Sequence, residues 1–211
     1  MYITMDVKKR NYEMRARQES TTATRTAIAE AAVACVMAER SLAITLNGVA
    51  ERAGVTVKTV LRHFGSRETL IEVTWSRIYQ DVLAERIAPA DEPVKALAVL
   101  IEHYERRGDM ALGILAEEDE DPRARLLCDS ARASHRSWVD EVFGRRLPVD
   151  PVERARFVDA LVVATDVYSW KLLRRDRGLS VDDVADRMLL LTDAVLGLSA
   201  RSRGATERTT R

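Results

Sequence analysis

The sequence predicts an all-α protein with an N-terminal three-helix domain, a connecting helix and a larger helical body, about nine helices in total. Three observations support this fold class. Apolar residues recur at intervals of three and four along most of the chain, glycine and proline are scarce at 9 and 5 of 211 residues, and no segment alternates apolar and polar residues over a useful length. A chain of this size can bury one good core, or carry a small domain attached to a larger one.

The formal net charge is zero, but the charge is unevenly distributed. Residues 1–67 hold 11 Lys/Arg against 6 Asp/Glu, a balance of +5, whereas residues 68–211 hold 22 against 27, a balance of −5. A basic N-terminal part beside an acidic remainder favours a nucleic-acid-binding head on a body with another role.

Two cysteines, Cys35 and Cys128, are too few for a disulfide framework, and both lie in helical apolar patterns. We therefore expect buried thiols in a reducing, cytoplasmic setting. No apolar run approaches the roughly 20 residues that a membrane span needs, and no signal peptide is recognisable. The sequence predicts no membrane association.

Residues 45–64 predict two short helices joined by a tight turn. Thr45 can cap the first helix and Thr56 the second, because a threonine hydroxyl accepts a hydrogen bond from an amide that has no partner inside the helix. Gly54 lies where the backbone must turn with a positive φ. The apolar positions at helical spacing are Leu46, Val49, Ala50 and Ala53 in the first helix and Val57, Val60, Leu61 and Phe64 in the second. These features describe a helix-turn-helix, whose second helix enters the major groove of DNA; the alternative is an ordinary helical hairpin.

The remaining elements follow from the same spacing. Residues 1–20 are polar and basic, so we expect a disordered arm, either a solvated tail or an additional DNA contact. A helix from Thr24 to about Arg40 completes the three-helix core, which Leu42 and Ile44 fill from the following link. Further helices are expected at about 68–87, 93–107, 109–116, 122–143, 152–175 and 180–199. The expected domains are the arm, a helix-turn-helix domain at 21–67, a larger helical body at 68–200 and a disordered tail at 201–211.

The segment from about Thr24 to Trp75 resembles the TetR family of transcriptional repressors. The resemblance rests on the first helix, Ala50, the Ala53-Gly54-Val55-Thr56 turn, Thr59, His63-Phe64, Ser66-Arg67-Glu68 and Leu70. More loosely, Tyr168-Ser169-Trp170-Lys171-Leu172-Leu173-Arg174-Arg175 and then Gly178-Leu179-Ser180 are similar to the end of the penultimate helix in many members. The chain departs from the family pattern at Leu61, where a tyrosine is common, and at Arg67, where a lysine is common. Arginine keeps the charge but presents a planar fork.

The DNA-contacting residues are expected on and around the second helix of the motif. Thr56, Lys58 and Thr59 project from the side opposite its apolar residues and are our candidates for base contacts. Candidates for phosphate contacts are Thr45, Arg62, His63 and Arg67. Because one short helix reads few base pairs, we expect a homodimer on a palindromic double-stranded operator, with recognition helices about 34–36 Å apart.

The resemblance also implies that residues 68–200 form a ligand-binding and dimerisation domain, which releases DNA when a small molecule binds. The last two helices are the expected interface, with Val163, Val167, Trp170, Leu191 and Val195 as candidates; alternatively, these residues pack within one subunit. The candidate effector-binding residues are Trp75, Tyr79, Leu100, Tyr104, Leu115, Trp138 and Tyr168, with His103 and Asp166 as polar fixing points. A binding site lined mostly by these apolar and aromatic residues would suit a hydrophobic or aromatic effector. Aromatic residues at helical spacing also form ordinary cores.

Other chemistries have little support in the sequence. The potential metal ligands are His103, His135, the two cysteines and the acidic run at 117–121, and no two of the His or Cys residues have ligand spacing. No nucleophile–base pair and no phosphate-binding loop is recognisable. We therefore expect neither a cofactor, a metal nor an enzymatic activity. The alternative function is a helical small-molecule-binding or interaction module without sequence-specific DNA binding.

Overall fold

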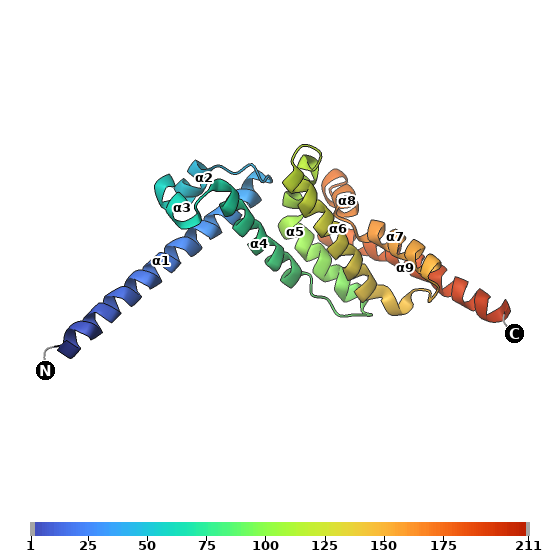
Figure 1. The fold of residues 1–211 in the computed structure, drawn as a ribbon. Helices are drawn as coiled ribbons and strands as arrows, with labels where there is room; N and C mark the ends of the chain where they lie inside the picture. The colour runs from blue at the N-terminus through green and yellow to red at the C-terminus, as the bar shows by residue number, and fades with distance from the viewer. Residues whose placement is uncertain (1–2, 210–211) are drawn as a thin grey trace. The chain divides into compact units, whose positions relative to one another are not determined.

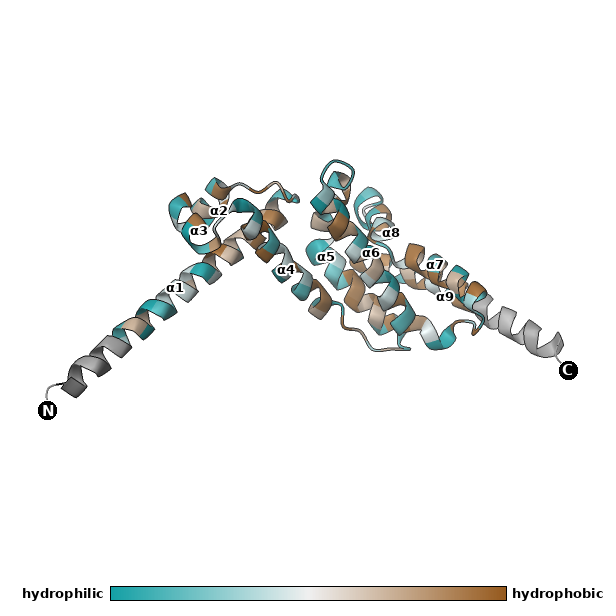
Figure 2. Cartoon of the chain, in the orientation of Figure 1, coloured by the Kyte–Doolittle hydropathy of each residue, from teal (hydrophilic) through white to brown (hydrophobic). Residues whose placement is uncertain are grey.

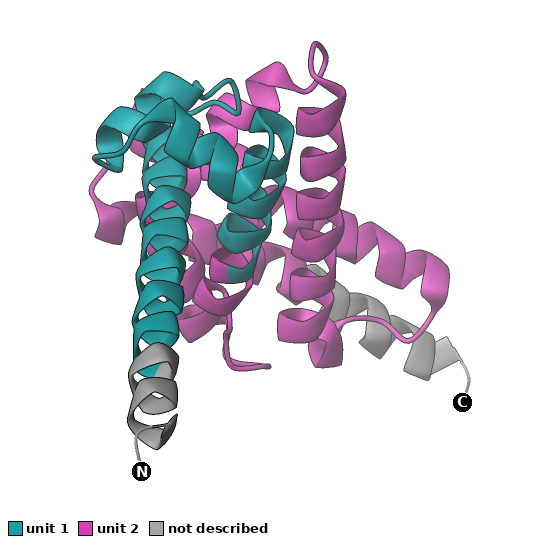
Figure 3. Ribbon diagram, turned by 60° about the vertical axis from the view of Figure 1, so that its left-hand side comes forward, with its two compact units in different colours: residues 1–80 teal, residues 81–211 magenta. Residues whose placement is uncertain are grey.

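The computed structural model describes the backbone of residues 3–209 and the side chains of residues 12–197. Within that part of the chain every regular element is a helix, which confirms the expected fold class and, closely, the expected number of helices (Figure 1). The chain divides into two compact units, Met1–Gln80 and Asp81–Arg211, which we call unit 1 and unit 2 (Figure 3). The division falls inside one helix, α4 (Arg67–Glu85).

Unit 1 contains α1 (Ile3–Glu39), α2 (Leu46–Arg52), α3 (Val57–Phe64) and most of α4. The two predicted caps are present: Oγ1 of Thr45 accepts from the amide of Gly48 at 3.0 Å, and Oγ1 of Thr56 accepts from the amide of Thr59 at 3.2 Å. Gly54 turns the chain between α2 and α3 with φ 66°. A side chain at that φ would be strained, so the turn needs glycine.

The core of unit 1 is built by apolar residues from all four helices and from the link between α1 and α2. Leu42 and Ile44 are 3% and 1% exposed, as expected for residues that fill the core from that link. The other large buried side chains are Ile28, Val36, Val49, Val60, Phe64, Leu70, Ile71 and Ile78. Burying one such side chain contributes roughly 1.5–3 kcal/mol. Leu61, which the spacing predicted on the apolar face of α3, is 38% exposed and does not belong to this core.

Unit 2 contains α5 (Pro93–Glu117), α6 (Pro122–Phe143), α7 (Pro151–Thr165), α8 (Val167–Lys171) and α9 (Val181–Thr209), with a short 3₁₀ helix η1 (Gly144–Arg146) and a π-helical turn η2 (Leu172–Asp176). Proline opens α5, α6 and α7, where the absent amide proton costs nothing. Hydrophobic and hydrophilic residues share these helices, as amphipathic packing requires (Figure 2). The largest fully buried residues are Leu97, Leu100, Ile101, Phe143, Leu161, Trp170 and Met188.

The boundaries differ from the predicted ones in four places. Residues 3–20, expected to be a disordered arm, are helical as part of α1; the segment has no glycine or proline to stop a helix that is already nucleated downstream. The expected helices 93–107 and 109–116 are one helix, α5. The expected helix 152–175 is divided at Asp166, which caps α8 by accepting from the amide of Tyr168 at 2.8 Å. The last helix, α9, extends into the expected tail.

Gly108, which lies between the two helices expected from the sequence, is an internal residue of α5. A Cβ atom at this position would lie 2.4 Å from Cζ3 of Trp170, so the indole ring crosses α5 directly over the glycine. The ring is held there by a 2.8 Å bond from its Nε1 to Glu105 and by the Arg175 guanidinium, 4.4 Å from its centroid. Gly108 is thus a packing position in the middle of a helix, and not a helix end.

None of the helices in the part of the chain that the structure describes combines the length and the apolarity needed to cross a bilayer.

Candidate nucleic-acid interface and buried polar cluster

The outer face of α3 carries the predicted base-contacting lysine. Lys58 and Arg62 are exposed and lie one turn apart, on the opposite side of the helix from the buried Val60 and Phe64. Thr59 lies beside them and is half-buried. The amphipathic pattern of α3 therefore places two cations where a helix of this kind meets the DNA groove.

The three predicted threonines are engaged within unit 1. Thr45 and Thr56 cap their helices, and the hydroxyls of Thr56 and Thr59 lie 3.0 Å apart in a hydrogen bond. Thr45 and Thr56 nevertheless remain exposed. Their first role is to hold α2 and α3 in place, and any DNA contact would be made by side chains that are already oriented by the caps.

His63 and Arg67 have partly structural surroundings. Nε2 of His63 is buried and has no hydrogen-bond partner among the described residues. Nε of Arg67 donates to the backbone oxygen of Ile44 at 2.9 Å and so ties the start of α4 to the link before α2. Their predicted phosphate contacts stay predictions, and for Arg67 only the rest of the guanidinium is available for one.

Arg25, which no sequence pattern marked, supports the recognition helix. Its Nη1 donates to the backbone oxygen of His63, and its guanidinium lies 4.2 Å from the centroid of the Phe64 ring. Arg25 thereby fixes the C-terminal end of α3 against α1. A basic residue on the outer side of a helix gives no sign in the sequence of such a long-range contact.

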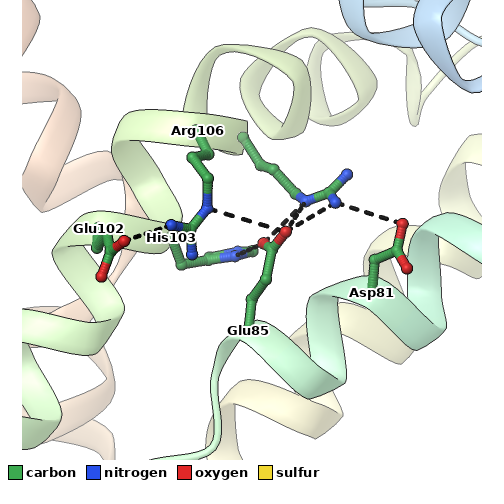
Figure 4. Close-up of polar contacts among 6 residues, drawn as sticks. Asp81, Glu85, Glu102, His103 and Arg106 are labelled. Atoms are coloured by element: carbon green, nitrogen blue, oxygen red, sulfur yellow. Dashed lines mark hydrogen bonds and ion pairs between the residues drawn. The ribbon is translucent and has the colours of Figure 1, made fainter.

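In unit 2, the end of α4 and the middle of α5 form an ion-pair network around Glu85 (Figure 4). The carboxylate accepts from Nδ1 of His103 at 2.9 Å and from Nη2 of Arg107 at 2.8 Å. Arg107 also reaches Asp81 at 3.5 Å, and Arg106 lies 3.9 Å from Glu85 and bonds Glu102 at 2.6 Å. The network attaches the last turn of α4 to α5.

A second group of polar side chains continues from Arg86, the residue after α4. Nη2 of Arg86 donates to Nδ1 of His135 at 2.6 Å, and His135 lies 3.1 Å from Oγ1 of Thr165 through Nε2. Tyr104 donates to the backbone oxygen of Thr165 at 2.9 Å, and Trp138 donates to that of Arg86 at 3.1 Å. We call Glu85, Arg86, His103, Tyr104, Arg107, His135, Trp138, Thr165 and Asp166 the buried polar cluster.

The hydrogen bonds define the tautomer of His135. An arginine can only donate, so Nδ1 of His135 accepts, and the proton is on Nε2. Nε2 then donates to Thr165, whose hydroxyl donates to the backbone oxygen of Leu161 at 2.7 Å. Protonation of His135 would set two donors against each other at 2.6 Å. The arrangement therefore requires a neutral imidazole.

Burial sets the charges of the cluster. It lowers the pKa of His135 to about 3, assisted by the positive charge of Arg86, and the pKa of His103 to about 4 against the opposing bond to Glu85. Burial likewise raises the pKa of Asp166 and lowers that of Arg86. Burial alone would raise the pKa of Glu85, but the combined bonds and charges of Arg107 and His103 lower it. Both histidines are neutral near pH 7.

The structure brings together four of the nine predicted effector-binding residues, namely His103, Tyr104, Trp138 and Asp166, around Arg86. Trp138 contacts Arg86 directly, His103 and Tyr104 bond Glu85 and Thr165 of the same cluster, and the charge of Asp166 acts on that of Arg86. Leu100 is fully buried, Leu115 is partly buried in the core of unit 2, and Tyr168 is exposed. Trp75 and Tyr79 are half-buried and belong to unit 1. From the sequence, His135 was predicted only as a potential metal ligand, and no local pattern marked Arg86 or Thr165.

Two of the five predicted interface residues are core residues instead. Val167 and Trp170 are 8% and 0% exposed, so they have almost no surface to offer a second copy. This prediction was wrong because helical spacing does not distinguish a face that packs within the subunit from one that packs outside it. Val163 and Leu191 are 68% and 45% exposed, and Val195 is half-buried.

The two cysteines are buried, as the apolar pattern predicted. Burial raises the pKa of Cys128 to about 11, which makes its thiol a poor nucleophile and a poor ligand. Among the described residues, no group of three or more His, Cys, Asp or Glu side chains has a geometry that could hold a metal ion.

A capped helix-turn-helix with an exposed cationic face on its second helix, followed by a separate helical unit, is the architecture of the helix-turn-helix class of DNA-binding proteins. Comparison with known proteins agrees. Residues 27–74 match the family model described as "Bacterial regulatory proteins, tetR family". The expected relationship is confirmed: the chain carries a tetR-family DNA-binding domain within the all-helical fold of these regulators.

Solved structures extend the similarity in fold to most of the chain. A tetR-family transcriptional regulator from Streptomyces coelicolor superposes with a TM-score of 0.67 at 16% identity, over 89% of this chain and 88% of that one. A transcriptional regulator from Rhodococcus sp. Rha1 superposes with a TM-score of 0.61 at 14% identity, over 84% and 96% of the two chains. No curated protein matches the chain.

Proposed function

We propose that this protein is a homodimeric transcriptional repressor that binds a palindromic operator and is released from it by a small-molecule effector. The exposed cationic face of α3 carries the proposal, since Lys58 and Arg62 lie on a recognition helix whose opposite face is buried. Lys58 donates to guanine acceptors in the major groove, and Arg62 and Thr45 contact phosphates on either side.

Dimerisation is supported by exposed apolar residues on helices that pack against each other. α7 and α9 are in contact within the subunit, and Val163 on α7 and Leu190 and Leu191 on α9 are 68%, 66% and 45% exposed. A second copy that covers these residues forms a four-helix bundle of two α7–α9 pairs. Two-fold symmetry then presents two recognition helices to successive major grooves, about 34–36 Å apart.

Release by an effector is supported by the continuity of α4. Its first residue, Arg67, follows the glycine and serine that come after α3, and its last residues, Asp81 and Glu85, bond to α5 of unit 2. A ligand that shifts the end of α4 therefore acts on the helix that begins at the DNA-binding motif. A coupling free energy of about 1–3 kcal/mol between the two sites gives a 5–150-fold change in operator affinity.

The proposal is tested by retardation of DNA from upstream of the protein's own or a neighbouring gene. Lys58→Ala removes a base contact and should cost about 1–3 kcal/mol per half-site, with the largest loss on the preferred sequence. Lys95→Ala is the matched control, because it removes the same charge from the exposed surface of unit 2. Equal binding by the Lys58 variant and the wild type would refute the site. Failure to retard any DNA at low salt would support the alternative of a helical module without DNA binding.

Dimerisation is tested separately by the molar mass in solution. Val163→Glu places a charge in the proposed interface and should shift the mass from two chains towards one. Leu126→Glu is the matched control, since Leu126 on α6 is as exposed as Val163, at 70%. A wild-type protein with the mass of one chain at every concentration would refute the dimer.

A further inference from the structure

Arg86 is a largely buried cation that lacks an anionic partner. Its Nε is buried and without a hydrogen-bond partner, and its one assigned hydrogen bond goes to the neutral His135. Among the described residues, no carboxylate oxygen lies within 4.0 Å of a guanidinium nitrogen of Arg86, the limit for an ion pair. A guanidinium has five N–H donors, and burying such a cation without a compensating anion is unfavourable.

The neighbouring arginines show that this is an exception within unit 2. Other partly buried arginines of the unit bond a carboxylate: Arg107 to Glu85 at 2.8 Å, Arg154 to Asp140 at 2.8 Å and Arg174 to Glu105 at 3.0 Å. Glu85, which precedes Arg86 in the chain, is fully occupied by Arg107 and His103. The sequence thus places an acid beside Arg86, but the fold assigns that acid to other partners.

From this geometry we propose that Arg86 is the anchoring residue for the carboxylate of an organic-acid effector. The inference rests on the proposed function, in which unit 2 binds the effector, and adds its chemical class. Nε and the neighbouring Nη of a guanidinium carry parallel N–H bonds, which match the two oxygens of a carboxylate. The carboxylate of the ligand is then the anionic partner that Arg86 lacks within the protein.

The surroundings specify a monocarboxylate with an apolar or aromatic body. The Trp138 ring lies 5.5 Å from the guanidinium and stacks on His135, with ring centroids 5.8 Å apart and an interplanar angle of 12°. Asp166 is the charged group that acts on Arg86, and the buried Tyr104 beside it is neutral because burial raises its pKa. Asp166 is committed to capping α8, and its negative charge disfavours a second anionic group on the ligand. Aromatic neighbours and one available cation therefore favour one carboxylate over inorganic phosphate.

The position of Arg86 connects this ligand to DNA release. Arg86 is the residue after α4, and Glu85 before it holds α5. A carboxylate that draws Arg86 away from His135 alters the contacts at the C-terminal end of the helix whose other end begins at the recognition motif. Bound anion and bound operator then compete through α4, in keeping with the reciprocity of linked sites.

The experiment uses the full chain and measures thermal stability and calorimetric binding with benzoate, phenylacetate, octanoate and inorganic phosphate. Benzamide and benzyl alcohol are the neutral counterparts of the aromatic acids. We expect at least one of the three carboxylates to bind and to raise the melting temperature, with no response to the neutral compounds or to phosphate. No response to any of the carboxylates at millimolar concentration overturns the proposal, and so does equal binding of the neutral compounds.

Variants separate a binding role of Arg86 from a structural one. Arg86→Met removes the charge but keeps an unbranched side chain, and should weaken carboxylate binding by about 10- to 100-fold. The melting temperature of the free variant, measured alongside, reports the structural cost of the lost bond to His135. Arg86→Lys keeps the charge without the fork and should also weaken binding. Arg145→Gln, at an exposed arginine of the same unit, should bind like the wild type. Carboxylate binding that persists in Arg86→Met overturns the proposal.

Operator retardation in the same samples distinguishes this inference from the proposed function. DNA binding that is intact but insensitive to every carboxylate overturns the assignment of Arg86 alone. Absence of DNA binding by the wild type overturns the proposed function. In that case the comparison of carboxylate binding by the wild type and Arg86→Met still decides whether the carboxylate site exists.

Discussion

Unit 2 should become less stable as the pH falls, because its buried histidines take up protons when it unfolds. Replacing His135 by glutamine should remove the part of this loss of stability that His135 causes. Glutamine can reproduce both bonds of the neutral imidazole, because its oxygen accepts from Arg86 and its amide nitrogen donates to Thr165. The substitution therefore deletes the titrating group and leaves the hydrogen-bonded chain in place.

The magnitude follows from the two protonation states. In the unfolded chain His135 takes up a proton near its ordinary pKa of 6.5, whereas burial keeps the folded imidazole neutral until about pH 3. Below pH 6.5 the unfolded state therefore binds more protons, and the free energy of unfolding falls as the pH falls, until the loss levels off near the folded pKa. One such group costs about 1.4 kcal/mol for each pH unit in this window. His103, with a folded pKa of about 4, acts in the same direction.

The assay is denaturant unfolding of the wild type and His135→Gln at steps from about pH 7 to about pH 5, followed by tryptophan fluorescence in a Trp75→Phe background. The remaining tryptophans, Trp138 and Trp170, belong to unit 2. The difference in unfolding free energy should change by about 1.4 kcal/mol per pH unit below pH 6, since contributions from other groups cancel. His63→Gln in unit 1 is the control. Parallel pH profiles for the wild type and His135→Gln would show that His135 is not held neutral and would refute the reasoning.

Two predictions concern packing and capping. Gly108→Ala should destabilise unit 2 by about 1–3 kcal/mol, less the helix-propensity gain of about 1 kcal/mol, because the new Cβ would lie 2.4 Å from the Trp170 ring. Ala98→Gly, at an exposed position of the same helix, calibrates the propensity, and a Gly108→Ala variant more stable than the wild type would contradict the steric argument. Thr56→Ala should cost unit 1 about 1 kcal/mol through loss of the α3 cap, whereas Thr56→Ser keeps the hydroxyl and should be nearly neutral. Both are measured by thermal unfolding, and equal loss in the two Thr56 variants would argue against capping.

The sequence alone determined the DNA-binding head, because its signals are local. A cap such as Thr56, a turn such as Gly54 and the spacing of Val60 and Phe64 each involve residues within about one helical turn of their partners. Chain order then places Lys58 and Arg62 on the outer face without any knowledge of the rest of the fold. The helix-turn-helix, its exposed cations and the family relationship could therefore be predicted.

Only the tertiary structure decided which residues meet inside unit 2. Arg86 contacts His135 across 49 positions of the chain, and Tyr104 contacts Thr165 across 61. No periodicity links residues so far apart, and a polar residue that is buried has the same letter as one that is solvated. For the same reason Trp170 was predicted at an interface, whereas its ring packs against Gly108 of α5 inside the subunit. Local spacing determines which face of a helix is apolar; only the packing of whole helices determines what that face meets.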